Sequence, residues 1–550
     1  MNFGFVIDNR KCIGCHACTV ACKAEHEVPV GVNRTWVKYI EKGTFPDTRR
    51  LFSVMRCNHC ADAPCVEICP VTALFTRKDG IVDFDDRRCI GCKACTQACP
   101  YDALYMHPDT HTSAKCNYCT HRVDIGLEPA CVNVCPEHAI ISGDMDNPSS
   151  EISQLLARET VSVRKPEKGT NPKLFYIDGD KASLDPTAAN PDTDYMWSSQ
   201  SSGVGHFARF ADAKARSGRN AGPTVGTAQR PADANRLVNI EGRGVAGETP
   251  AVQSPRRVYD APNKGVLWGW EVSAYILTKA IAAGAFLVPI VPSYFVDVQP
   301  RVKLISALVA LVFLAITGAL LVMDLGRPER FIYTLLRPQW RSWLTRGAYI
   351  ITGYGGLLTV WVVLSYLGCV APLKFIEPVL IVLALLTAVY TAFLFAQAKG
   401  RDFWQSPMLG LHMIIHAVLA GAAAFFVMSG LRSYFSLSWL PNWPPTNAGG
   451  SDIFVYLAVG SIVLHLVTLA IELTMTHSTA DAHAVAKMIT DGEFANKFWF
   501  GMVFVGNILP LMSLLLGPQA AIAPAGIVIL IGLWFAEDIW VKAPQQIPLA

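Results

Sequence analysis

The chain has 550 residues and a formal net charge of +3 at pH 7, and no Lys/Arg tract in it supports nucleic-acid binding. Its length allows two or more domains. Its composition is uneven, because 16 of its 17 cysteines precede residue 136 and apolar runs of about 20 residues recur from about residue 266 onward. We therefore expect a cysteine-rich domain followed by a membrane domain.

The cysteine-rich part could hold either disulfides or metal clusters. A disulfide scaffold belongs to exported and usually short chains. The start, MNFGFVIDNRKC, shows neither a charged-then-apolar export segment nor a twin arginine. Ligation of metal ions or clusters is therefore the favoured interpretation.

Four cysteine motifs follow one another. The first and third are C-x2-C-x2-C-x3-C, the second is C-x2-C-x4-C-x3-C, the fourth is C-x2-C-x11-C-x3-C, and the last three end in Cys-Pro. In chain order their cysteines are Cys12, Cys15, Cys18, Cys22; Cys57, Cys60, Cys65, Cys69; Cys89, Cys92, Cys95, Cys99; Cys116, Cys119, Cys131 and Cys135. A C-x2-C-x2-C loop wraps three thiolates around one iron-sulfur cubane, whereas the fourth thiolate binds a different cluster. Zinc sites use isolated C-x2-C pairs, so iron-sulfur clusters are predicted.

One local match points elsewhere. CIGCH, from Cys12 to His16, fits the pattern of c-type haem attachment. That chemistry needs export and converts both thiols to thioethers, whereas here both belong to a run of four cysteines. We therefore interpret His16 as a loop residue.

Residues 1 to about 180 resemble the four-cluster ferredoxin subunits of molybdopterin oxidoreductases, such as dimethyl sulfoxide, polysulfide and tetrathionate reductases. Besides the motifs, the resemblance rests on GDMDNPSSEISQLLA and KPEKGTNPKLFYI. It implies an α+β ferredoxin-like tandem dicluster domain that carries four [4Fe-4S] clusters as a linear wire between two partners. The resemblance also implies that cysteines of motif one share clusters with those of motif four, and cysteines of motif two with those of motif three. The implied ligand sets are Cys12, Cys15, Cys18 and Cys135; Cys116, Cys119, Cys131 and Cys22; Cys57, Cys60, Cys65 and Cys99; and Cys89, Cys92, Cys95 and Cys69.

Residues 181–264 differ from both flanking parts. They are rich in Ser, Gly, Ala, Asp, Asn and Arg and show no periodicity. This composition predicts a polar linker that is flexible or extended. A docking arm for another subunit is the alternative.

Eight apolar segments follow, centred near residues 280, 313, 357, 387, 419, 463, 507 and 528. Each is about 20 residues long, which is enough to cross a bilayer as a helix. The eighth is the least certain, because Pro524 and Gly526 interrupt it. Residues 265–550 are therefore predicted to form an all-α, eight-helix transmembrane bundle with both ends on one side.

Basic residues near the segment ends predict the orientation. Thirteen lie on the side of the cysteine-rich domain and four on the other. The thirteen are Arg256, Arg257, Lys264, Arg327, Arg330, Arg337, Arg341, Arg346, Lys399, Arg401, Lys487, Lys497 and Lys542, and the four are Arg301, Lys303, Lys374 and Arg432. Basic loops stay in the cytoplasm. The chain is therefore predicted to be a multi-pass protein of the inner cell membrane with its clusters in the cytoplasm.

The membrane half also resembles a known family over most of residues 265–550. The resemblance rests on GWEVSAYILTKAIAAGAF, DLGRPERF, WLTRGAY, YTAFLFAQAKG and FWQSPML, of which DLGRP is the most specific element. These stretches are similar to the polysulfide-reductase (NrfD-type) membrane subunits. The resemblance implies electron exchange with a quinone such as menaquinone, at a pocket among the first four or so helices, and no haem.

Ionisable side chains inside a span are functional candidates because burying them is costly. Glu271, Tyr275 and Lys279 are spaced four apart, so they share one face of the first span. At a quinone site Glu271 would relay protons, Tyr275 would donate to a carbonyl and Lys279 would stabilise negative charge. Tyr390, which matches a fourth-span tyrosine of the family, would meet the other carbonyl. The alternatives are structural ion pairing for Glu271 and Lys279 and plain packing for Tyr390.

Three histidines also fall inside spans. His412 and His416 share a face of the fifth span, and His465 lies in the sixth. They could hold a b-type haem, serve protons or quinone, or be satisfied core histidines, and the last interpretation is favoured. An interfacial ion pair among Asp324, Arg327 and Arg330 is predicted at the end of the second span, where a charge costs little free energy.

Together these patterns predict an electron-transfer and membrane-anchor subunit. It would pass electrons through four [4Fe-4S] clusters between a separate molybdopterin or tungstopterin catalytic subunit and membrane quinone. The first alternative is an electron-transfer and proton-translocating module of a larger respiratory complex with cytochrome partners. A second is a transporter with a redox sensor, which would favour inverted repeats that the sequence does not show. Because 180 residues full of cluster ligands leave no room for a pterin domain, we expect one part of an oxidoreductase.

Overall fold

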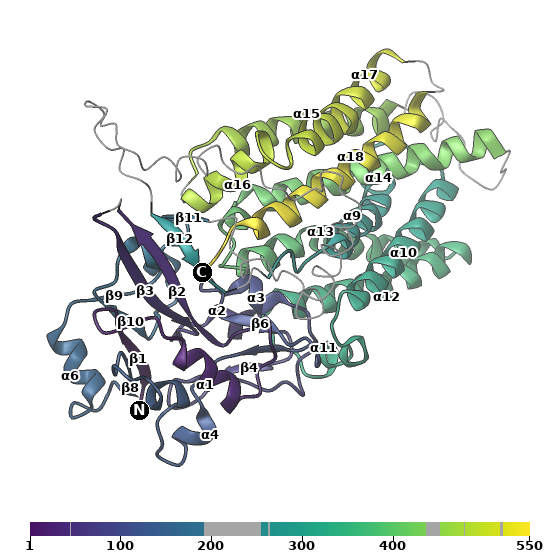
Figure 1. The fold of residues 1–550 in the computed structure, drawn as a ribbon. Coiled ribbons are helices and arrows are strands. Elements are labelled where there is room, and N and C mark those ends of the chain that lie inside the picture. Colours follow the sequence, from purple (N-terminus) through teal and green to yellow (C-terminus); the bar gives the residue numbers. More distant parts are fainter. Residues whose placement is uncertain (44–45, 192–254, 262–263, 436–451, 478, 518–520) are drawn as a thin grey trace, which may run out of the picture.

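The structure is a computed structural model that describes residues 1–550 except 44–45, 192–254, 262–263, 436–451, 478 and 518–520. Its cysteine-rich N-terminal domain lies against one end of a bundle of long helices (Figure 1). The N-terminal domain combines short strands with short helices, and the bundle is helical. This is the predicted fold class, an α+β ferredoxin-like domain followed by an all-α bundle.

Two four-stranded sheets and two hairpins form the framework of the N-terminal domain. The first sheet has the order β8-β1-β10-β9, with β1 parallel to β10 and antiparallel to β8, and the second has the order β11-β12-β2-β3. The hairpins are β4-β5 and β6-β7. The strands are β1 (Phe3–Asp8), β2 (Thr35–Lys42), β3 (Arg49–Arg56), β4 (Leu74–Thr76), β5 (Val82–Phe84), β6 (Leu104–Met106), β7 (Ser113–Lys115), β8 (Ile140–Asp144), β9 (Val161–Ser162), β10 (Leu174–Ile177), β11 (Asn190–Pro191) and β12 (Arg256–Tyr259).

Among its described residues, the domain has seven short α-helices, of which α1 to α5 carry or adjoin the cysteines. They are α1 (Ala17–Glu25), α2 (Pro64–Ile68), α3 (Ala94–Ala98), α4 (Thr120–Val123), α5 (Ala130–Asn133), α6 (Glu151–Arg158) and α7 (Lys181–Leu184). Proline at the first position of α2 fits a helix start, because the missing N–H has no partner there in any case. Since most of these helices are a single turn long, packing around the cysteines must hold them in place rather than helix propensity.

The described ends of segment 181–264 are ordered parts of the N-terminal domain. Helix α7 and strand β11 follow residue 180, and β12 pairs with β2 in the second sheet. The middle of the predicted linker lies outside the described residues. The domain boundaries at residues 180 and 265 stay predictions.

Eight helical segments of the bundle are long and apolar enough to cross a membrane, as predicted. The helices of these segments are α9 (Trp270–Ile290), α10 (Pro300–Met323), α12 (Trp343–Tyr366), α13 (Val370–Gln397), α14 (Met408–Phe435), α15 (Asp452–Thr474), the π-helical η6 (Lys497–Ile508) continued by α17 (Leu509–Leu516), and α18 (Ile522–Lys542). The short helices α11 (Tyr333–Leu336) and α16 (Ala480–Thr490) lie between spans. Because the number of spans is even, both ends of the bundle face the N-terminal domain.

The least certain predicted span is a continuous helix. Pro524 lies in the first turn of α18, where a missing N–H costs nothing. Gly526 lies where a Cβ would come 2.7 Å from the carbonyl oxygen of Ala423 in α14, so the glycine permits close helix packing. Neither residue interrupts the span.

The domain interface joins the second and third cysteine motifs to the ends of the spans. Trp268 Nε1 donates to the Cys92 carbonyl at 3.1 Å, and Ser342 Oγ donates to the Ile68 carbonyl at 2.7 Å. One apolar core runs across this boundary and includes Cys69 as well as Trp268. These two motifs are therefore fixed directly to the membrane domain.

Candidate functional site

The repeated CIGC loops owe their shape to left-handed backbone positions. Gly14 and Gly91 have φ of 73° and 72°, and the residues after the second cysteine, His16 and Lys93, have φ of 60° and 61°. Glycine tolerates this conformation at no steric cost. His16 is a loop residue as predicted, since it directly precedes α1 and packs its ring against Tyr259.

The thiols gather into groups that combine different motifs. Burial raises the pKa of Cys22, and the nearby Cys116 and Cys131 raise it further, although Cys22 belongs to the first motif. Burial likewise raises the pKa of Cys12, with Cys135 of the fourth motif contributing. The structure thus brings cysteines of the first and fourth motifs together.

The second and third motifs are interleaved in the same way. Burial raises the pKa of Cys99 to about 11, and Cys57 of the second motif adds to the shift. Burial raises the pKa of Cys69, with Cys89 of the third motif contributing. Helix α2 contains Cys65 and is followed directly by its C-cap residue Cys69, and the neighbouring α3 contains Cys95 and is followed by Cys99. Each of these helices therefore contributes cysteines to two different clusters of thiols.

Buried, closely spaced thiols fit iron-sulfur clusters. Burial and mutual repulsion favour neutral thiols, which is why their pKa values are raised. Iron would supply the positive charge that lets several buried thiolates lie together. Cys15 is exposed and Cys92 is close to the membrane domain, so the groups extend from the surface to the bundle.

Two buried cations beside the thiols were missed from the sequence. Arg56 is fully buried and lies near Cys18, Cys116 and Cys131, and its guanidinium carbon lies 4.3 Å from the centroid of the Phe5 ring. Burial lowers the pKa of Arg56, but the three thiolates outweigh burial and keep the guanidinium charged.

The second cation is Lys115. It is also fully buried and donates to the carbonyls of Val82 and Cys116. Burial raises the pKa of Cys57, and the charge of Lys115 opposes that rise. A basic residue in the short strand β7 gave no signal in the sequence beyond its place one residue before a motif cysteine.

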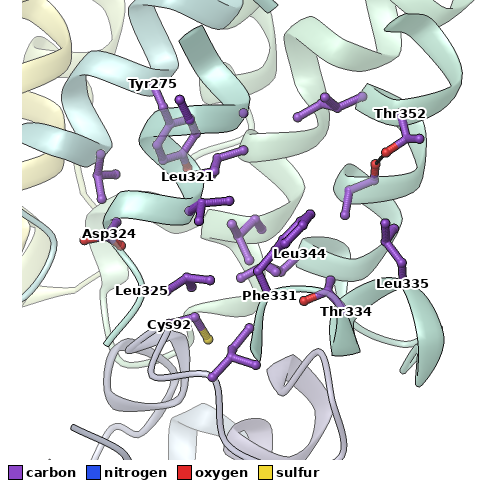
Figure 2. A pocket seen from close by; sticks show the side chains of 18 of the residues that line it. Cys92, Tyr275, Leu321, Asp324, Leu325, Phe331, Thr334, Leu335, Leu344 and Thr352 are labelled. Carbon is purple, nitrogen blue, oxygen red and sulfur yellow. Dashed lines mark hydrogen bonds between the residues drawn. The ribbon is translucent and has the colours of Figure 1, made fainter. Parts of the chain in front are cut away.

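A cavity of about 580 Å³ lies between the third cysteine motif and the membrane helices. Figure 2 shows its walls, with Cys92 at the end next to the N-terminal domain and Tyr275 on the side of the membrane helices. Its lining is mostly apolar, with a few polar groups that include Asp324, Thr334 and Thr352. Volumes of about 300–1,000 Å³ with an apolar lining and few polar groups are typical of small-molecule sites.

Two of the four predicted quinone-site residues line this cavity, namely Tyr275 from α9 and Tyr390 from α13. Lys279 packs against the ring of Tyr390, and its Nζ lies 4.7 Å from the ring centroid. Its Nζ donates to the Ala388 carbonyl at 3.0 Å and to Thr391 Oγ1 at 2.5 Å. Lys279 therefore joins α9 to α13, as in the alternative of a lysine paired to another helix, and it does so through uncharged acceptors.

The fourth predicted residue, Glu271, is not among the residues that line the cavity. It is half-buried in the first turn of α9, and its Oε2 lies close to Gly269. Its proton-relay role stays a prediction.

At the end of the second span, Asp324 pairs with Lys93 of the cysteine-rich domain and not with Arg327 or Arg330 as predicted. Lys93 Nζ lies 2.8 Å from Asp324 Oδ1, so the pair joins the third cysteine motif to the end of α10. Arg327 Nε donates to the Thr110 carbonyl, and Arg330 donates to the Cys89 carbonyl. Both arginines thus hold cluster-domain loops, and Arg327 Nη1 also lies 3.4 Å from Glu329 Oε1.

Comparison with known proteins identifies both halves. Residues 260–537 match the family described as polysulphide reductase, NrfD, and residues 11–74 and 48–145 match two 4Fe-4S dicluster families. The chain belongs to the NrfD family. Its first half carries iron-sulfur clusters, so the protein is an iron-sulfur electron-transfer unit fused to a multi-pass NrfD membrane domain.

Several curated proteins resemble the iron-sulfur half. A tetrathionate reductase subunit of Salmonella typhimurium is 44% identical over 188 residues, which is 34% of this chain and 75% of that protein. One of the polysulfide reductase chains of Wolinella succinogenes is 40% identical over 188 residues, 33% of this chain and 97% of that protein. Protein NrfC of Escherichia coli K12 is 42% identical over 180 residues, 32% of this chain and 81% of that protein.

The NrfD domain holds a second polar site, around the three histidines. One ring nitrogen of each of His412, His416 and His465 lies within 4.8 Å of those of the other two. His416 Nε2 lies 3.1 Å from His465 Nε2, which leaves no room for a haem macrocycle between these rings. His416 and His465 are buried and contact polar groups, in keeping with the favoured interpretation as satisfied core histidines, whereas His412 Nε2 makes no aligned hydrogen bond.

Proposed function

We propose that this protein passes electrons through four [4Fe-4S] clusters between a molybdopterin or tungstopterin catalytic subunit and membrane quinone. The observation that carries the proposal is the cavity, where Cys92 lies on one wall and Tyr275 and Tyr390 on the others. A cluster ligand and a pocket of suitable size for a quinone headgroup thus share one space. Clusters would supply one-electron redox steps, and the protein would orient the quinone and deliver protons.

The proposed ligand sets follow the neighbours of each thiol. The first set lies next to the second, because Cys18 is near Cys131. The second set lies next to the third, because Cys116 is near Cys57. Helices α2 and α3 connect the third set to the fourth. In this order the sets are Cys12, Cys15, Cys18 and Cys135; Cys22, Cys116, Cys119 and Cys131; Cys57, Cys60, Cys65 and Cys99; and Cys69, Cys89, Cys92 and Cys95.

The catalytic partner would dock at the exposed end of this series. Cys15 is exposed there, and Ile13 and Val20 beside it are 56% and 64% exposed. Ile125 and Leu127 near α4 are also exposed, and α4 adjoins α1 through His121 and Glu25. Apolar side chains gathered on a surface mark interaction sites. Relatives named as parts of reductases support a catalytic partner here.

The direct test uses the purified full chain. Its clusters should be reduced by dithionite and then re-oxidised by a water-soluble quinone analogue, with rates followed by cluster absorbance. We expect saturable re-oxidation that a quinone-site inhibitor blocks. Re-oxidation that rises linearly with quinone and ignores the inhibitor would contradict a quinone site.

Replacing Cys22 with serine should remove the cluster held mainly by the fourth motif. Cys22 lies near Cys116 and Cys131 rather than in the set of its own motif. We expect bound iron to fall from about sixteen to about twelve atoms per chain, with the Cys12 set intact. Iron analysis with low-temperature EPR checks this, and loss of the Cys12 cluster instead would contradict the crossed ligation.

Asp324 is proposed to supply protons to the cavity. Among the described residues, it is the one acidic side chain that lines this cavity. Burial raises the pKa of Asp324, against the opposing charge of Lys93, so the carboxyl holds a proton to higher pH than an exposed aspartate. Asp324→Asn should therefore slow re-oxidation about a hundredfold or more, the lower end of the scale of a lost acid–base group. Glu329→Gln, in the loop that follows, is the matched control and should leave the rate unchanged.

The iron-sulfur domain is proposed to face the cytoplasm from the inner cell membrane. The support is the excess of Lys and Arg on its side of the bundle. A cytoplasmic reporter fused after Ala550 should be active and a periplasmic one inactive. The opposite pattern would place the clusters outside and overturn this orientation.

A further inference from the structure

A buried polar cluster lies inside the NrfD domain, and none of its members lines the cavity. It draws on four spans, α14, α15, η6 and α18. All six side chains are under a tenth exposed. They are His412, His416, His465, Glu472, Asn507 and Glu537.

Hydrogen-bond directions can be assigned from one fixed amide. Asn507 Nδ2 donates to the Met502 carbonyl at 2.7 Å, so its Oδ1 is the atom that faces His465. Because Oδ1 only accepts, His465 Nδ1 must carry the hydrogen of this 3.0 Å contact. The lone pair of neutral His465 is then on Nε2.

The same reasoning applies to His416. Its Nδ1 lies 2.7 Å from Glu537 Oε1, and an ionised carboxylate only accepts. The lone pair of His416 is therefore also on Nε2, and the two Nε2 atoms lie 3.1 Å apart. Two facing lone pairs repel, so this contact needs a cation.

The third histidine adds unsatisfied groups to the same place. His412 Nε2 lies 2.9 Å from Glu472 Oε2, yet neither that nitrogen nor either Glu472 oxygen makes an aligned hydrogen bond. A buried, unpaired carboxylate is costly. No Lys or Arg of the described residues is within ion-pair distance of Glu472 or Glu537. Balancing both carboxylates thus takes two positive charges, which two protons or one divalent ion would supply.

A proton between His416 and His465 would satisfy only that pair, whereas one divalent ion would balance both carboxylates. A metal-binding histidine turns one nitrogen to the ion and donates from the other to a carboxylate or carbonyl. We propose that His412, His416 and His465 bind one divalent transition-metal ion of the Zn²⁺ type, with Glu472 beside it. Glu537 and Asn507 are positioning residues. This site shares no lining residue with the proposed quinone site.

The test begins with anaerobically purified full-length protein that is treated with a mild chelator, loaded with Zn²⁺ and gel-filtered. We expect about one retained zinc per chain, measured by mass spectrometry. His416→Ala and His465→Ala should reduce it to background. The matched control is His483→Ala, an exposed histidine of α16, which should retain the full zinc content.

Zinc-edge X-ray absorption of the wild type gives a second measurement that needs no variant. A shell of N/O ligands at about 2.0–2.1 Å with imidazole scattering is expected. A sulfur shell at about 2.3 Å would place the zinc in the cysteine motifs and overturn the proposal. Absence of retained zinc in the wild type would overturn it too, and would leave a shared proton between His416 and His465.

Discussion

Replacing Gly318 with phenylalanine is expected to stop electron exchange between the clusters and quinone almost completely. Gly318 lies in α10 and lines the cavity, and a Cβ added there meets no heavy atom within 4 Å. The helix can therefore accept the side chain, and the ring would occupy the space proposed for the quinone. Overpacking of this kind costs about 1–3 kcal/mol or more, which is at least about a five- to 150-fold loss.

The measurement is the re-oxidation rate of dithionite-reduced clusters by a water-soluble quinone. Gly356→Phe provides the matched control, because Gly356 is an exposed glycine of α12 where an added Cβ also meets nothing. Iron content and dithionite reduction should be unchanged in both variants. Wild-type re-oxidation by the Gly318 variant would mean that quinone reacts elsewhere on the chain.

Replacing Arg56 with glutamine is expected to lower the reduction potentials of the first two clusters of the series. Cys18 belongs to the first proposed ligand set, and Cys116 and Cys131 belong to the second, so Arg56 is placed beside both. Reduction adds a negative charge, which a buried guanidinium stabilises. At an effective dielectric constant of about 20, a unit charge about 7 Å away contributes about 2 kcal/mol, on the order of 100 mV for one electron.

An EPR-monitored redox titration would measure this shift. Arg49 is the control, since it lies on the same strand but its side chain is 71% exposed and pairs only with Asp178 at 3.5 Å. Water and salt screen an exposed charge, so Arg49→Gln should leave the potentials unchanged. Equal shifts in the two variants would show that overall charge, and not the buried position, sets the potentials.

The cysteine spacing and the apolar segments could be interpreted from the sequence because each follows a local rule. The C-x2-C-x2-C loop fixes its own geometry, and a span needs only a length and a composition. The eighth span was less certain because the effect of Pro524 depends on the helix start, and the value of Gly526 depends on α14. Neither position is visible without the neighbouring helix.

Residues that act through partners from distant segments were harder to predict. Arg56 lies in strand β3, outside every motif, and only the fold brings it to the thiols. The sequence predicted Lys279 and Tyr390 as site residues, but it did not predict that the lysine packs against the tyrosine ring. Glu472, Asn507 and Glu537 could have been found by the rule that identified Glu271, since each is a polar residue inside an apolar span.

The sharing of ligands by α2 and α3 has a consequence for how the protein is made. Each helix carries one ligand of the third proposed cluster and one of the fourth, so neither cluster can be inserted without ordering both helices. The same loops are then covered by the NrfD domain, where Trp268 bonds to the Cys92 carbonyl. We therefore expect these two clusters to be inserted together during maturation, before the iron-sulfur domain seats on the membrane helices.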